Sequence, residues 1–226
     1  MTRVSPRLCT GAVLAAASVV LLTGCGAVPD LNPGVAVSIG DDTVSTRHVA
    51  DLASDYCDAA KPQLEGQPLP RHYLNGRVAG SLALRSAADQ MMAARDVTID
   101  ASYAAAVKQA ETQLTDLTDA QRAAIVEVQG SEVYVAAAEL AVGRASLGAG
   151  ASDEEATAAG EKEFLAWLDD HDVRIDPRYG VAIEKGQSVL KDSSLSVAVT
   201  NTAKQADATT PDSTYAALLP PTQRCG

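Results

Sequence analysis

The histidines are the residues of this chain that first suggest chemistry, because imidazole serves both as a metal ligand and as a proton carrier. The sequence holds three of them, His48, His72 and His171. His171 lies within Asp169–Asp172, a composition compatible with a metal site. Four consecutive residues at a helix end cannot all point in one direction, so we favour a solvated helix terminus. His48 and Asp51 are three residues apart, which indicates a pair on a helix surface.

The sequence lacks the motifs of the common catalytic and cofactor sites. It contains no Gly-x-Ser-x-Gly elbow, no His-Glu-x-x-His pair, no Walker loop and no dinucleotide-binding fingerprint. We therefore predict that the protein is not an enzyme and uses neither a cofactor nor a metal. Met91 and Met92 could form a deformable patch that binds other chains, although core packing is the favoured interpretation. Arg178 and Tyr179 are interpreted as structural residues of a turn.

The charge and the aromatic content exclude two further classes of partner. The chain carries 18 Lys and Arg against 29 Asp and Glu, and its formal charge of -11 opposes binding to nucleic acid through phosphate neutralisation. Aromatic residues make up only 4% of the chain, which disfavours surfaces that stack bases or sugars. Apolar residues make up 46%, enough for a buried core.

Cys25 follows a segment with the features of a bacterial export signal. Arg3 and Arg7 form a positive start, and the apolar run Leu8–Leu22 is too short for an ordinary transmembrane helix. Leu22-Thr23-Gly24-Cys25 then resembles a lipobox, in which a cysteine after two small residues receives a diacylglyceryl group on its thiol. The alternative is an ordinary secretory signal with a chance cysteine.

The lipobox interpretation defines how the chain begins. Residues 1–24 form the signal peptide, Cys25 carries the lipid, and residues 25–34 form a tether. Removal of the signal takes away Arg3 and Arg7 and so changes the formal charge from -11 to -13. Because several acyl chains hold a protein firmly on a membrane, we expect a lipid-anchored protein of the cell membrane that faces outside the cytoplasm.

Two cysteines remain after these steps. Cys9 leaves with the signal and Cys25 is used for the lipid, so Cys57 and Cys225 remain in an oxidising compartment. We predict a disulfide between them, which would hold the C-terminal tail against the first helix. Two unrelated thiols are the alternative, although the spacing fits no compact metal motif.

The domain is predicted to open with a hairpin and a capped helix. Residues 35–39 alternate with period two, Gly40 begins a turn, and Thr43-Val44 is extended again. Ser45 or Thr46 then caps a helix that Pro62 closes. The apolar face of this helix consists of Val49, Leu52, Ala53, Tyr56, Cys57 and Ala60.

Helical patterns continue through the middle of the chain. The Ala-rich residues 70–96 predict a long helix, and Ser131 opens another that runs through Leu147. Two capping boxes, at Thr118 to Gln121 and at Ser152 to Glu155, mark further helix starts. Residues 100–114 predict a helix that carries Tyr103, Val107, Ala110 and Leu114 on one stripe. In total we expect a mainly α fold of five or six helices with a small β-sheet.

The C-terminal part is expected to contain extended segments and a tail. Val173 and Ile175 alternate before a break at Pro177, and Leu195, Val197 and Val199 could pair with the N-terminal hairpin. Residues 201–214 contain no large aliphatic residue, so we expect no ordered structure there. Apolar residues return next to Cys225, at Tyr215, Leu218 and Leu219. We therefore predict a domain of residues 35–200 and a flexible tail of residues 201–226 that re-docks through Cys225.

Two segments at opposite ends of the helical region resemble a known family. Val35–Ser45, which runs through Gly40 into a capped helix, is similar to the opening hairpin of the SurA N-terminal domain family. Asp176-Pro177-Arg178-Tyr179-Gly180 is similar to the segment that closes this domain in the family. Together they frame residues 34–183 behind the lipobox.

The resemblance implies a helical chaperone domain related to SurA, trigger factor and the PrsA foldases. In such a domain a small sheet joins the two chain ends, and helices form an apolar cradle for unfolded polypeptides. Many members also carry a parvulin prolyl isomerase domain, but here the helix after Ser152 leads directly to the closing segment. Because no parvulin domain fits between them, the resemblance implies a chaperone without isomerase activity. In a separate departure from the family, Val181 stands where an aromatic residue is often found.

Functions of different classes are consistent with the sequence. The first is a non-enzymatic envelope chaperone, or holdase, that binds unfolded or extended secreted polypeptides on an exposed apolar surface. The second is a structural or adaptor lipoprotein that binds one envelope protein through a small patch. The third is a binder of small ligands, with an enclosed pocket of convergent polar groups. In each case we expect membrane contact through the lipid and no nucleic acid partner.

Overall fold

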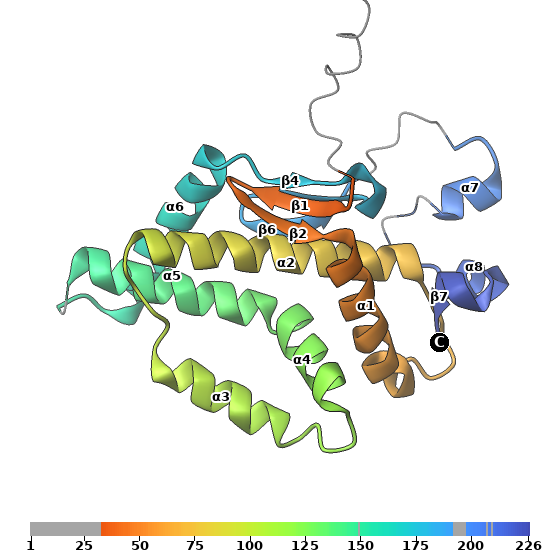
Figure 1. Cartoon of the computed structure of the whole chain (residues 1–226), viewed down its shortest axis with the longest axis horizontal. Helices are drawn as coiled ribbons and strands as arrows, with labels where there is room; N and C mark the ends of the chain where they lie inside the picture. Colours follow the sequence, from red (N-terminus) through yellow and green to blue (C-terminus); the bar gives the residue numbers. More distant parts are fainter. Residues whose placement is uncertain (1–32, 149, 192–197, 207, 209) are drawn as a thin grey trace, which may run out of the picture. The chain divides into compact units, whose positions relative to one another are not determined.

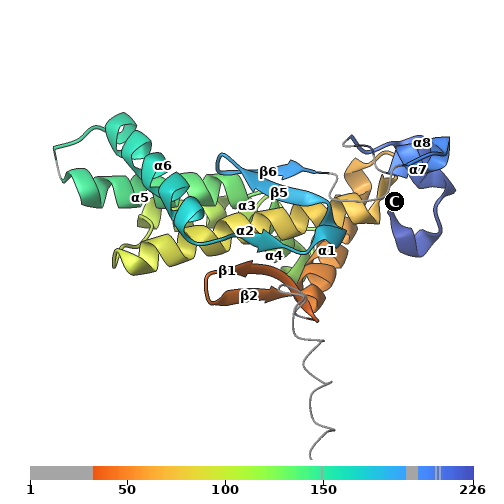
Figure 2. The same ribbon diagram turned by 90° about the horizontal axis from the view of Figure 1, so that it is seen from above.

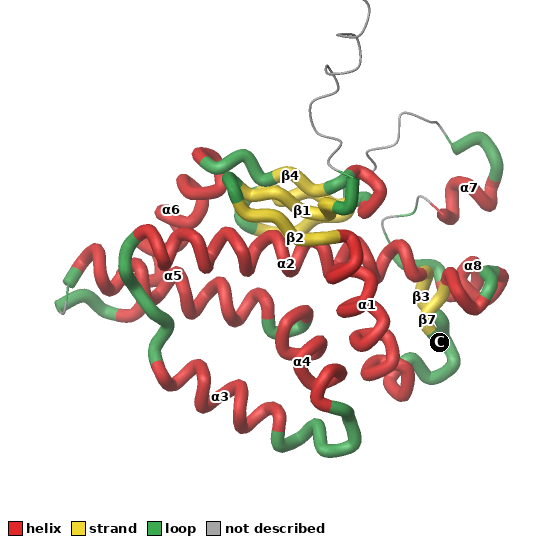
Figure 3. The backbone as a smooth tube through the Cα atoms, in the orientation of Figure 1, coloured by secondary structure: helices red, strands yellow, loops and turns green. Residues whose placement is uncertain are grey.

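The computed structural model describes residues 33–148, 150–191, 198–206, 208 and 210–226. The predicted signal peptide, Cys25, most of the tether, Leu195 and Val197 lie outside the described residues. Residues 34–226 form one compact unit. The prediction of a mainly α-helical fold is confirmed, since α-helices and short antiparallel sheets form the described part of this unit (Figure 3). The described residues hold eight α-helices where five or six were expected, because two short helices form in the tail.

A three-stranded antiparallel sheet holds the start of the unit. β1 (Val35–Ile39) pairs with β2 (Asp42–Ser45), which confirms the predicted hairpin. β1 also pairs with β4 (Arg174–Ile175), where Val37 lies opposite Ile175. Val199, which the sequence suggested as a partner of the hairpin, is instead in no strand and is exposed. The segment before Pro177 takes that place, and its Ile175 packs against the core.

α1 (Thr46–Ala60) begins at the predicted cap, where the Ser45 side chain accepts a hydrogen bond from the His48 N–H at 3.1 Å. The helix ends before the 3₁₀ turn Lys61–Gln63, which contains Pro62. The inward face is the predicted one except at its end, where Ala59 is buried in place of Ala60. Its buried residues are Val49, Leu52, Ala53, Tyr56, Cys57 and Ala59.

α2 (Arg71–Ala94) is the central element of the unit. The β1–β2–β4 sheet lies over it, and α5 runs below it (Figure 1). Met91 and Met92 are buried in its core face, so the hypothesis of an exposed methionine patch is wrong. Helix starts at 119 and 153 confirm both capping boxes. The helices that follow α2 are α3 (Ala101–Glu111), α4 (Asp119–Val128), α5 (Ser131–Leu147) and α6 (Asp153–Asp170).

α5 and α6 cross at two glycines. A Cβ atom at Gly143 would lie 1.7 Å from the Ala156 carbonyl oxygen, and one at Gly160 would lie 1.8 Å from the Glu139 carbonyl oxygen. Both positions therefore need a residue without a side chain, because the obstructing atoms belong to the backbone of the facing helix. This crossing fixes which residues of the two helices lie next to each other.

A second hairpin follows the closing segment. Asp176 caps the 3₁₀ turn Pro177–Tyr179, and Tyr179 is buried. β5 (Val181–Glu184) then pairs with β6 (Gln187–Leu190) through a two-residue turn. Seen from above, this hairpin lies along α2, beside the first sheet (Figure 2). Sequence analysis missed it.

The tail is anchored beside the end of α1. β7 (Arg224–Cys225) pairs with β3 (Leu69–Pro70), and a disulfide joins Cys225 to Cys57. α8 (Ser213–Leu218) packs near β3, although Leu218 is 79% exposed, so its predicted docking role is wrong. Ala216 is the buried residue of α8 instead.

Residues 201–206 form the short helix α7 (Asn201–Ala206), where the sequence predicted no ordered structure. The Thr200 hydroxyl oxygen accepts a hydrogen bond from the Ala203 N–H at 3.1 Å, which stabilises the first turn. No residue of α7 is buried. Local capping therefore forms this helix without the apolar burial that the composition lacks.

Candidate functional site

The residues that first suggested chemistry lie apart in the structure. The His171 ring stacks on Trp167 with 3.7 Å between ring centroids, and its Nδ1 lies 2.9 Å from the Trp167 carbonyl oxygen. Within the described residues, no three His, Cys, Asp or Glu side chains gather into a metal-binding group. The His48 ring lies 3.9 Å from the Glu127 carboxylate on the neighbouring helix α4. Its acidic neighbour is therefore Glu127 and not Asp51, which the sequence predicted on the same helix.

Arg178 and Tyr179 hold the turn of the closing segment. The Arg178 guanidinium pairs with Asp176 at 2.8 Å, and the Asp176 carboxylate also accepts the Arg178 N–H at 3.0 Å. The buried Tyr179 lies against α2, where a Cβ atom at Gly76 would come within 2.5 Å of the Tyr179 carbonyl oxygen. These contacts agree with a structural role for both residues.

α3 stands apart from the other helices and leaves an open hollow beside it. No described helix or strand packs along α3 (Figure 1). The predicted helix is confirmed but ends at Glu111, so Leu114 lies beyond it, and none of the residues of α3 is buried. Tyr103, Val107 and Leu114 of the predicted stripe are half-buried, and Ala110 is exposed. Tyr103 meets Tyr134 of α5, but no described helix or strand covers the rest of the stripe along its length.

We call the space beside the start of α3 the arm hollow. It has a volume of about 510 Å³. Its apolar lining comes from the end of α2, the loop before α3, α3 itself and α5: Met92, Val97, Ile99, Ala101, Tyr103, Ala104 and Tyr134. Asp89, Asp96 and Asp100 also line it and are exposed, so apolar groups sit beside three carboxylates.

Tyr134 connects the arm hollow to α2 and α3. Its ring meets Tyr103 edge-on with 5.6 Å between centroids, and the Arg85 guanidinium lies 3.9 Å above it. The Tyr134 hydroxyl donates to the Asp89 carboxylate. Burial, together with this hydrogen bond, raises the pKa of Tyr134. The tyrosine therefore stays neutral and holds the first turn of α3 in place.

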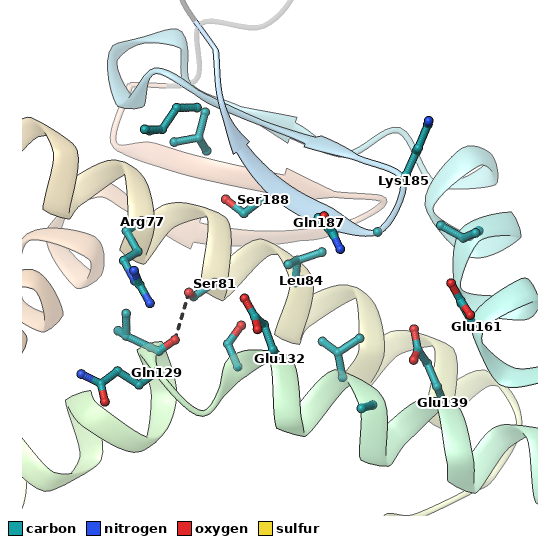
Figure 4. Close-up of a pocket in the computed structure, with 18 of the residues that line it drawn as sticks. Arg77, Ser81, Leu84, Gln129, Glu132, Glu139, Glu161, Lys185, Gln187 and Ser188 are labelled. Atoms are coloured by element: carbon teal, nitrogen blue, oxygen red, sulfur yellow. Dashed lines mark hydrogen bonds between the residues drawn. The ribbon is translucent and has the colours of Figure 1, made fainter. Parts of the chain in front are cut away.

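A second hollow, the hairpin groove, lies between α2, α5, α6 and the β5–β6 hairpin (Figure 4). Its volume is about 500 Å³. Buried apolar residues of four elements form its floor: Leu84, Val128, Val135 and Val181. Its polar lining includes Arg77, Gln129, Glu132, Glu139, Glu161, Gln187 and Ser188. In the close-up, Arg77 lies at the opposite end of the groove from Glu139 and Glu161.

The crossing of α5 and α6 places Glu139 next to Glu161. The two carboxylates point toward each other in Figure 4, since Gly160 rests on the backbone of Glu139. Burial, and then repulsion from Glu161, raise the pKa of Glu139 to about 7. A cation that entered this end of the groove would relieve the repulsion.

The raised pKa predicts that stability depends on pH through Glu139. Its pKa rises from 4.5 to about 7 on folding. Between these pH values the unfolded chain loses the proton that the folded chain keeps, so the free energy of unfolding falls as pH rises. Glu139→Gln should flatten this slope and raise Tm at pH 8 by roughly 2–4 °C, or about 1 kcal/mol, because water screens the half-buried group.

Thermal unfolding at pH 5 and pH 8 measures this effect. Glu65→Gln is the matched control, because Glu65 is exposed and does not line the groove. Equal pH slopes for Glu139→Gln and the unsubstituted protein would contradict the prediction.

No family model, curated protein or solved structure matches this chain. The SurA-like interpretation therefore stays a prediction. Among the described residues, no helix combines the length and the hydrophobicity needed to cross a bilayer.

Sequence reasoning missed most residues of both hollows. One available signal was Lys185-Gly186 between two alternating segments, which is a typical two-residue hairpin turn. A second was glycine within the predicted helices at 143 and 160, which often marks close helix packing. The meeting of Glu139 and Glu161 had no sequence signal, since it depends on how α5 and α6 cross.

Proposed function

We propose that this protein is a lipid-anchored, non-enzymatic holdase that binds extended segments of secreted polypeptides in the arm hollow. The observation that carries the proposal is the isolated position of α3. Its half-buried stripe and the apolar lining of the hollow form a surface that an apolar segment of another chain can cover. The predicted export signal and the SurA-like end segments support the same function.

The charges around the arm hollow suggest which segments it prefers. Asp89, Asp96 and Asp100 surround its apolar lining. The formal charge of the whole chain, -11, adds a field that attracts basic chains and repels acidic ones. We therefore propose a preference for apolar segments flanked by Lys or Arg, bound weakly at roughly micromolar Kd (about -8 kcal/mol).

Holdase activity predicts that the detergent-solubilised full-length protein suppresses aggregation of a reduced, unfolded secreted protein without ATP. The measurement is light scattering at increasing molar ratios, with one basic and one neutral client. Added salt should weaken the effect more strongly for the basic client, because it screens the carboxylates. Unchanged aggregation at several-fold molar excess would contradict the holdase and favour an adaptor for a single protein.

A pair of substitutions in the lining of the arm hollow locates the activity. Val97→Ser with Ile99→Ser removes apolar surface from this lining, and should reduce the suppression at least about twofold, since each loses roughly 1 kcal/mol of apolar contact. Both residues are half-buried, so Tm of the variant is measured beside the suppression to show that the protein still folds. Leu218→Ser is the control, as Leu218 is an exposed leucine on α8 outside the hollow. Equal losses from the control and the variant of the lining would place the activity elsewhere.

The anchor has a separate prediction. Cys25→Ser should abolish incorporation of labelled fatty acid and should leave the signal peptide uncut by the lipoprotein peptidase, because the thiol is the acceptor in the lipobox interpretation. Metabolic labelling followed by mass determination of the N-terminal peptide measures both. Lipid labelling that persists in this variant would contradict the anchor.

A further inference from the structure

The β6 strand presents one of its edges to the hairpin groove. The Lys191 N–H donates to the Gly180 carbonyl at 2.9 Å, which identifies these two residues as a hydrogen-bonded pair. Bonded and non-bonded pairs alternate along an antiparallel ladder. With Val181 opposite Leu190 and Ile183 opposite Ser188, the Ser188 and Leu190 backbone groups must point away from β5.

This outer edge has no strand beside it in the described part of the chain, where β6 pairs with β5 alone. Ser188 and Leu190 both line the hairpin groove. An extended chain lying in the groove would therefore find two backbone N–H groups and two carbonyl oxygens at the spacing of a β-ladder.

The opposite side of the groove determines which side chains such a strand should carry. Leu84 and Val135 on the floor offer apolar contacts. Glu132, Glu139 and Glu161 lie along α5 and α6 and face the groove (Figure 4), while Lys185 points away from it. A side chain with a terminal positive charge would lie next to Glu139 and Glu161 at the end of the groove opposite Arg77, and Glu132 lies nearer the middle.

We propose that the hairpin groove binds an extended basic segment of another polypeptide, which adds to the edge of β6 as a third strand. Its backbone pairs with Ser188 and Leu190, an apolar side chain rests on Leu84 and Val135, and a Lys or Arg side chain reaches Glu139 and Glu161. The site is distinct from the arm hollow, and binding here does not depend on holdase activity.

The charge pattern favours this occupant over others. An acidic strand would meet the three carboxylates, and a helix has no free backbone groups with which to pair to β6. A volume of about 500 Å³ holds a few side chains of one strand. The basic partner also matches the negative charge of the whole chain, -11.

The test uses two terminally capped nine-residue peptides, one alternating Val with Lys and one alternating Val with Glu, added to the detergent-solubilised full-length protein. Fluorescence anisotropy of labelled peptides should show at least about tenfold tighter binding of the Lys peptide. Hydrogen exchange should slow at the Ser188 and Leu190 amides when this peptide binds. Equal binding of the two peptides, or unchanged exchange at both amides, would overturn the proposal.

Two pairs of substitutions separate charge at the groove from charge elsewhere. The double variant Glu139→Gln with Glu161→Gln should weaken binding of the Lys peptide about tenfold. Glu65→Gln with Glu154→Gln removes the same charge outside the groove and should change binding less than twofold. A peptide N-methylated on its valines, which cannot donate backbone hydrogen bonds there, should also bind at least tenfold more weakly. Equal effects of the two double variants would overturn the site, whatever the outcome of the aggregation assay.

Discussion

Valine at Gly143 or Gly160 is expected to destabilise the protein more than any substitution on its surface. A Cβ atom at Gly143 would lie 1.7 Å from the Ala156 carbonyl oxygen, and one at Gly160 would lie 1.8 Å from the Glu139 carbonyl oxygen. No rotamer change can relieve an overlap with backbone, so the two helices must separate. We expect a loss of at least about 3 kcal/mol, which corresponds to a Tm lower by roughly 6–12 °C.

Differential scanning calorimetry of Gly143→Val and Gly160→Val measures this loss. Gly150→Ala is the control, because nothing lies within 4 Å of a Cβ atom there. Separation of α5 and α6 also moves Glu139 away from Glu161, so the groove should lose its preference for the Lys peptide. A Tm within about 1 °C of the unsubstituted protein would contradict the close crossing.

Reduction of the Cys57–Cys225 disulfide is expected to have an effect of similar or greater size. The bond joins residues 168 positions apart, and Cys225 also belongs to β7, which pairs with β3. A crosslink that closes so long a loop restricts the unfolded chain and contributes about 5 kcal/mol in the chain-entropy treatment. Loss of that contribution should lower Tm by roughly 10–20 °C.

Calorimetry with and without reductant, together with the double variant Cys57→Ser and Cys225→Ser, measures the contribution. Reductant should leave the Tm of the double variant unchanged, which separates the bond from other effects of the reagent. Peptide mapping without reduction should show the two cysteines linked in protein extracted from membranes. Two freely alkylated thiols in the native protein would contradict the prediction.

Helix boundaries were the part of the fold that the sequence predicted well. Local signals mark them: Ser45 and Asp100 are side-chain caps, Thr118 and Ser152 form capping boxes, and Gly148 ends α5. Each of these interactions lies within one turn of the residue that makes it. Such signals can be found in a sequence without knowledge of what the helix packs against.

Packing partners were predicted less well, because they depend on residues far away in the chain. The apolar stripe of α3 did not indicate its partner, and among the described elements only its Tyr103 was found to meet a ring, that of Tyr134 on α5. β1 finds its third strand at β4, although the alternation around Val199 pointed to a later segment. The pairing of β1 with β4 places Val37 against Ile175, a contact that no local pattern in either segment specifies.

The two hollows show the same difference between local sequence signals and contacts that depend on distant residues. The acidic character of the chain was evident from its composition, but the carboxylates that face the hairpin groove come from α5 and α6. The carboxylates of α5 and α6 come together because the two helices cross at Gly143 and Gly160. The hairpin forms the other side of the groove because it packs over Gly80, where a Cβ atom would lie 1.9 Å from the Ser188 hydroxyl oxygen. Residue types thus indicated the chemistry of the site, and tertiary packing determined its place.

The joining of distant segments also bears on when the protein can fold. β1 pairs with β4, β3 pairs with β7, and Cys57 is bonded to Cys225. Early parts of the chain therefore cannot complete these contacts until residues that are synthesised much later are present. Contacts of such long range form slowly. A domain that closes only when its last segments are present is compatible with the export that we propose. In that case folding would finish on the far side of the membrane, where an oxidising compartment would let the final bond form.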